Sequence, residues 1–151
     1  MDIEPELFLV SYNETSKRHA ILSDEGHAAF LYLHEASDDP NTTAPIDGDV
    51  IAYNRVALIE VKEVESYRPK LPPIAKGYGH AAAVINDPKT NEWKFSWSDD
   101  GLSVLLLKDG EPWCLLAKSE ENGYSKVIKV AGPWGSPWDD SKAGELFLPA
   151  V

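Results

Sequence analysis

The chain has 151 residues, the size of one domain, and carries 25 acidic against 14 basic side chains, a net charge of −11. Such a charge repels nucleic acid and anionic membrane surfaces and favours basic protein partners, although acidity also serves simple solubility. Cys114 is the single cysteine, so an intrachain disulfide is excluded. Residues 1–5 lack the basic start and apolar stretch of a signal peptide, and no apolar run approaches the roughly 20 residues that span a membrane. The composition therefore predicts a cytosolic protein that binds neither nucleic acid nor membrane.

The N-terminal part of the chain begins with two predicted strands, at residues 7–10 and 19–22, which would form a hairpin. Residues 26–36 are ambiguous. Ser23 is a good N-cap residue and is followed by two acidic residues, which favours a helix. The apolar run 30–33 fits a buried strand equally well, and periodicity does not decide between the two. Local propensity favours the helix slightly.

The middle of the chain follows a loop rich in Pro, Gly and Asp and is predicted to form strands at residues 50–53 and 56–64. A Pro-rich linker then covers residues 66–76, because proline fixes φ and favours an extended backbone. A further strand is predicted at residues 80–85.

The clearest structural signal lies in residues 92–108. Aromatic residues alternate with polar ones from Trp93 to Trp97, which places three aromatic rings on one face of a strand. The sequence Ser98-Asp99-Asp100-Gly101 has turn chemistry and precedes an apolar strand at 102–108. These features predict a strand, a tight turn and a buried strand.

The C-terminal part continues with Asp109-Gly110, a two-residue hairpin signal that predicts a returning strand at 113–117. Another strand is predicted at 124–130. An irregular aromatic tail follows, and its residues 145–148 are expected to tie the C-terminus onto a sheet.

The spacing of the turn signals predicts an α+β fold, strand-dominated, with antiparallel sheet meanders and one or two short helices in one globular domain spanning 1–151. A second hypothesis is an internal duplication. A shift of 75 residues lays 7–33 over 82–108 with five identities in 27 pairs. Under this pseudo-repeat, linker 66–76 would join two similar halves, and residues 26–33 would form a strand.

The sequence contains no motif that points to catalysis, a cofactor or a metal. The adjacent carboxylate pairs fall short of the roughly six to eight oxygen ligands of a calcium site, so they are expected to be turn or helix-cap residues. The four histidines lack zinc-binding spacing. The prediction is therefore no cofactor and no metal.

The aromatic tail is the strongest candidate for binding. Trp134 and Trp138 stand among prolines and glycines and are followed by Asp139 and Asp140. Exposed tryptophans in rigid loops anchor protein interfaces. Two alternatives remain open here: the indoles could plug the end of a sheet, or stack on sugar rings.

These features predict a small acidic, cytosolic, non-enzymatic protein-binding protein, of the bacterial immunity or antitoxin type, with a basic protein as partner. Its predicted interface is both acidic and aromatic and consists of Trp134, Trp138, Asp139, Asp140, Asp99 and Asp100. One alternative is an enzyme or small-ligand binder with a site assembled from distant residues, of which His80, Asp99 and Tyr78 are the first candidates. The other alternative is a sugar-binding module.

Overall fold

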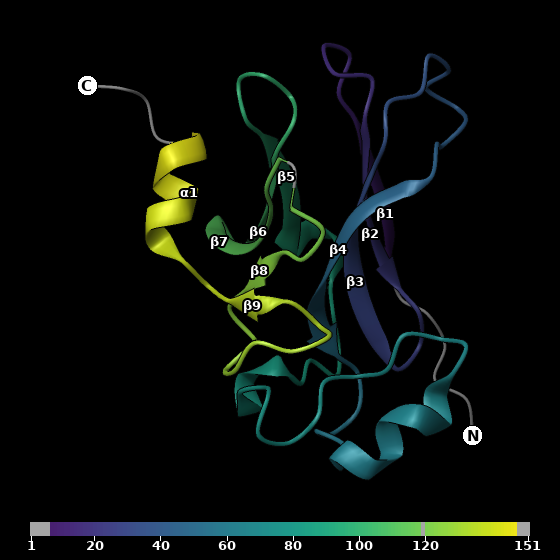
Figure 1. Cartoon of the computed structure of the whole chain (residues 1–151), viewed down its shortest axis with the longest axis vertical. Helices are drawn as coiled ribbons and strands as arrows, with labels where there is room; N and C mark the ends of the chain where they lie inside the picture. Colours follow the sequence, from purple (N-terminus) through teal and green to yellow (C-terminus); the bar gives the residue numbers. More distant parts are fainter. Residues whose placement is uncertain (1–6, 119, 148–151) are drawn as a thin grey trace.

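The computed structural model describes residues 7–118 and 120–147, which form two β-sheets that meet at their inner strands (Figure 1). The first sheet is antiparallel throughout and has the order β1-β2-β3-β4. Its strands are β1 (Phe8–Tyr12), β2 (His19–Asp24), β3 (Ala28–His34) and β4 (Ile46–Asn54). The second sheet has the order β5-β6-β7-β8-β9 and is antiparallel except for its last pair. Its strands are β5 (Trp93–Trp97), β6 (Val104–Lys108), β7 (Glu111–Leu116), β8 (Tyr124–Ser125) and β9 (Ser136–Pro137).

Helical structure in the described residues is short. It consists of three 3₁₀-helices, η1 (Val61–Tyr67), η2 (Ala81–Ala83) and η3 (Thr90–Glu92), and one α-helix, α1 (Asp140–Phe147). The prediction of a strand-dominated fold with antiparallel meanders is therefore confirmed.

The two sheets are joined along β4. Its backbone exchanges hydrogen bonds with the segment after β7: Asp49 N–H donates to the Glu121 carbonyl, and Gly123 N–H donates to the Asp49 carbonyl. Between the sheets, the thiol of Cys114 on β7 lies 3.5 Å from the Ile51 carbonyl of β4 and is fully buried. One hydrophobic core therefore contains residues of both sheets.

The register of the first sheet separates an inner and an outer face, because residues directly opposite each other on neighbouring strands share a face. The inner row is Leu9, Leu22, Leu31 and Val50, and the next row, on the outer face, is Val10, Ile21, Tyr32 and Asp49. The first row is buried apart from Leu9 at the edge, whereas Val10 is 50% exposed.

The helix favoured for residues 26–36 is wrong, because this segment contains strand β3. Ser23 does not cap a helix but pairs with Phe8 and Phe30 inside β2. Gly26 has a φ of +97° and allows the tight turn from β2 into β3. β3 is the most buried strand of this sheet and pairs on both sides, so tertiary pairing outweighs the local helix propensity.

Three other predicted strands are wrong in whole or in part, and the expected attachment of residues 145–148 to a sheet is not seen in the described residues. Residues 56–64 make only an isolated bridge at Ile59 and then enter η1, and residues 80–85 contain η2. The strand predicted at 124–130 is only two residues long. Residues 145–147 belong to α1, and Leu148 lies outside the described residues. These segments form short helices, isolated bridges or a two-residue strand, and periodicity cannot separate such short apolar segments from longer strands.

The proposed duplication stays a prediction. Under the 75-residue shift, hairpin β2–β3 coincides with hairpin β5–β6, within one or two residues at each strand end. Strand β1 has no such counterpart, because the corresponding residues 83–87 contain the end of η2 and an isolated bridge at Val84.

Candidate functional site: an acidic loop end

Four loops gather at one end of the two sheets. They are residues 13–18 after β1, 35–47 around the start of β4, 98–103 after β5, and 118 with 120–123 after β7. Together we call these four loops the acidic loop end. Antiparallel strand order places alternate turns at the same end of each sheet. Contacts between the loops confirm the arrangement: Ser37 N–H donates to the Lys17 carbonyl at 2.7 Å, and a Cβ on Gly101 would lie 2.5 Å from Asn13 Oδ1.

The acidic loop end holds much of the charge of the molecule. Its loops carry nine carboxylates against three basic side chains, a net charge of −6 out of −11 for the whole chain. The carboxylates are Glu14, Glu35, Asp38, Asp39, Asp47, Asp99, Asp100, Glu120 and Glu121. Residues 55–92 lie at the opposite end (Figure 1) and carry five acidic and six basic side chains. The charge is therefore polarised along the strands.

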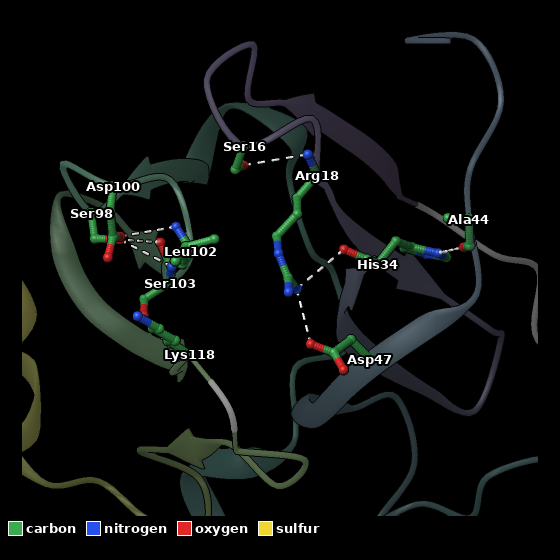
Figure 2. Close-up of polar contacts among 10 residues, drawn as sticks. All are labelled: Ser16, Arg18, His34, Ala44, Asp47, Ser98, Asp100, Leu102, Ser103 and Lys118. Carbon is green, nitrogen blue, oxygen red and sulfur yellow. Dashed lines mark hydrogen bonds and ion pairs between the residues drawn. The ribbon is translucent and has the colours of Figure 1, made fainter. Parts of the chain in front are cut away.

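The turn 98–103 is built around the carboxylate of Asp100 (Figure 2). Ser98 Oγ–H donates to Asp100 Oδ1 at 2.7 Å, and Leu102 N–H donates to the same oxygen at 3.0 Å. These two hydrogen bonds hold the pKa of Asp100 below its usual value. Asp100 and its exposed neighbour Asp99 thus form a fixed turn, as predicted, and the Asp100 side chain is held in its ionised form.

We expect Gly101→Ala to lower the free energy of unfolding by about 2 to 4 kcal/mol. Gly101 has a φ of +71°, and its added Cβ would meet Asn13 Oδ1 at 2.5 Å. That oxygen cannot easily move, because it accepts hydrogen bonds from the N–H groups of Thr15 and Ser16, each at 2.9 Å.

Gly110→Ala is the matched control, because Gly110 has a φ of +81° but open space around the added Cβ. It should show the backbone cost alone, about 1 to 2 kcal/mol. Urea unfolding of both variants measures the difference. Equal decreases in the free energy of unfolding for the two variants would show that the turn after β5 does not pack against the loop after β1.

The loop 35–47 carries four of the nine carboxylates and is fastened to the first sheet (Figure 2). Two buried histidines hold its backbone: His34 Nδ1 lies 2.6 Å from the Ala44 carbonyl, and His19 Nε2 lies 2.7 Å from the Pro40 carbonyl. Arg18 binds Asp47 at 2.9 Å and also donates to the His34 carbonyl. The carboxylates of this loop therefore project from an ordered backbone.

Asp39, at the tip of this loop, shows the same local stabilisation as Asp100. The N–H of Asn41 and the hydroxyl of Thr42 each donate to its carboxylate at 2.9 Å. They hold the pKa of Asp39 below its usual value. The acidic loop end thus contains at least two carboxylates whose ionised form is favoured by fixed donors.

Trp134 does not occupy the exposed position predicted for it. It is 4% exposed, its ring lies 5.3 Å from that of Tyr78, and its Nε1–H donates to the Pro72 carbonyl. An indole buried in this way cannot anchor a partner. Trp134 therefore packs inside the molecule, as in the alternative in which the indoles cover the end of a sheet. The sugar-binding alternative loses one of its two stacking surfaces.

The other residues of the predicted tail interface lie at the start of α1. Trp138 is half-buried, with Lys126 Nζ 5.4 Å from its ring centre. Asp139 is exposed and its Oδ1 accepts the N–H of Lys142, and Asp140 accepts the Trp138 Nε1–H. Lys142 also binds Glu120 at 2.8 Å, so α1 lies beside the acidic loop end.

The residues named for a distant-residue active site are not brought together. Asp99 belongs to the acidic loop end, whereas Val84, close to His80 in the chain, bridges Asn54 at the far end of β4. Within residues 7–118 and 120–147, no group of three or more His, Cys, Asp and Glu side chains is placed to hold a metal ion. The carboxylates of the acidic loop end are thus spread over a surface rather than gathered around one point.

The described part of the chain contains no helix that is both long enough and apolar enough to cross a membrane. Comparison of the chain with protein-family models, curated proteins and solved structures finds no match.

Proposed function

We propose that this chain is a cytosolic, non-enzymatic protein-binding protein of the immunity or antitoxin type that covers a basic surface of its partner with the acidic loop end. The observation that carries the proposal is the net charge of −6 on four loops at one end of the sheets. A concentrated charge of one sign attracts a basic partner over a distance and orients it before contact.

Two structural features support binding rather than mere solubility. The loops are held by hydrogen bonds to the sheets and to one another, so little conformational entropy would be lost when a partner binds. The charge is also uneven, whereas acidity that serves only solubility can be distributed over the whole surface.

The test compares two variants of equal net charge. The first replaces Glu14, Asp38, Asp99 and Glu121 by the corresponding amides. These side chains are exposed and accept no hydrogen bond from another described residue. The control replaces Glu65, Asp87, Asp109 and Glu111, which are exposed and lie away from the four loops. Each variant has a net charge of −7.

With poly-lysine as the basic probe, stopped-flow association at low salt should slow about tenfold or more for the loop variant. The control variant should change by less than about twofold, because only the loop carboxylates direct the approach. A partner captured from the host should cross-link to residues 98–103. Equal slowing of both variants would contradict the proposal, since binding would then follow net charge alone.

A further inference from the structure

Strand β1 is the outer strand of the first sheet, and its outward backbone groups pair with no other described residue. Asp24 N–H donates to the Leu7 carbonyl, and Asn13 N–H donates to the Arg18 carbonyl, each at 2.9 Å. Hydrogen-bonded pairs alternate along an antiparallel ladder, so Phe8, Val10 and Tyr12 direct their N–H and C=O groups away from β2. None of these groups has a hydrogen-bond partner among the described residues.

The side chains of β1 do not protect this edge. Phe8 is 66% exposed and Val10 is 50% exposed, on the outer face. Residues 8–12 contain no charged side chain and no proline, and their pairing with β2 has no bulge. Natural edge strands usually carry such features to prevent pairing with another chain. Strand β5, for comparison, has Lys94 within it.

We propose that β1 pairs with β1 of a second copy of this chain, antiparallel, on a two-fold axis at Val10. In this register Val10 faces the partner's Val10, and Phe8 faces the partner's Tyr12. The outward N–H and C=O groups of all three residues then form about six hydrogen bonds across the axis. The two first sheets become one continuous sheet of eight strands, and the aromatic pairs on its outer face add cross-strand contacts.

The register is self-complementary, and the charge distribution favours the antiparallel orientation of the two copies. The acidic loop end adjoins the Tyr12 end of β1, so antiparallel pairing places the two loop ends at opposite extremes of the dimer. The five residues of β1 span about 17 Å, which exceeds the screening length of about 10 Å at 0.1 M salt. Parallel pairing would bring the two acidic ends together. The dimer therefore leaves both loop ends accessible.

The first measurement is sedimentation equilibrium of the full chain over a range of concentrations. The mass should rise from 16.7 kDa toward twice that value. Val10→Lys should give a monomer at all concentrations, because it places two like charges opposite each other on the axis. Val130→Lys is the matched control, since Val130 is 49% exposed and lies outside β1. It should dimerise like the parent chain.

The second measurement keeps the test independent of the stability of the lysine variant. Under oxidation, Val10→Cys should give a disulfide-linked dimer on a non-reducing gel, because opposite residues in such a pair have Cα atoms about 5.5 Å apart. Val130→Cys should give none, and the native Cys114 is buried. A parent chain that is monomeric throughout would overturn the proposal. So would a dimer that survives Val10→Lys, or β1 amides that are protected from exchange only when a basic partner is bound.

Discussion

Asp24→Asn should lower the free energy of unfolding by about 3 to 5 kcal/mol, the usual effect of breaking a buried ion pair. The carboxylate of Asp24 is fully buried and lies 2.9 Å from Arg55 Nη1, whose side chain is 7% exposed. It also accepts the hydroxyl of Tyr53 and the N–H of Gly26, each at 2.8 Å. Asparagine keeps the size of the side chain but removes the negative charge that faces the buried guanidinium.

Asp47→Asn provides the control for this prediction. Its partner Arg18 lies at the same distance, 2.9 Å, but the two side chains are 38% and 20% exposed. Solvent screens such a pair, so the loss should stay below about 1 kcal/mol. Urea unfolding at neutral pH measures both variants. Similar decreases in the free energy of unfolding for the two variants would contradict the burial of the Asp24–Arg55 pair.

Trp134→Ala should lower the free energy of unfolding by about 3 to 5 kcal/mol, because it opens a large cavity. The indole is 4% exposed, packs against Tyr78 and donates to the Pro72 carbonyl at 3.0 Å. Trp134 thus holds the Pro-rich segment against the β8–β9 region, and its removal should leave that carbonyl without its donor.

Trp138→Ala is the control, because it removes a tryptophan that lies partly on the surface instead of one that is buried. Trp138 is half-buried and interacts mainly with Lys126 and Asp140, so its loss should cost about 1 kcal/mol. Thermal unfolding gives the stabilities, and association with poly-lysine at a temperature where both variants are folded gives the binding. Slower association for the folded Trp134 variant would contradict its assignment as a plug.

The segment that local sequence signals described best is β5–β6–β7. Three signals predict this segment: the aromatic alternation from Trp93, the turn at Asp99 and Asp100, and the Asp109-Gly110 hairpin. Each signal acts within a few residues, so the sequence alone predicts these three strands and their turns. Asp109 and Gly110 indeed have φ values of +52° and +81°, which a type I′ turn requires. The sequence does not predict strand β3, because its conformation depends on the strands paired on both sides.

The candidate site depended on contacts that the sequence does not reveal. Local signals predict Asp99 and Asp100 as turn residues, but their grouping with the other loops rests on long-range contacts. Gly101 lies against Asn13, and Gly48 lies against the carbonyls of Glu120 and Glu121. Alternate turns of a meander share one end, so the charge of alternate turns was the signal that could have shown the site. The burial of Trp134 required knowledge of the distant Pro72 carbonyl.

The position of Cys114 between the sheets gives the chain a chemical reporter of its own. Its thiol touches the Ile51 carbonyl and lies 3.4 Å from Ser125 Oγ. Burial raises its pKa to about 12, so almost no reactive thiolate exists in the folded state at neutral pH. A reagent can modify this sulfur only after β7 has separated from β4. The rate of thiol labelling therefore measures how often the two halves of the core come apart, and it does so without an introduced label.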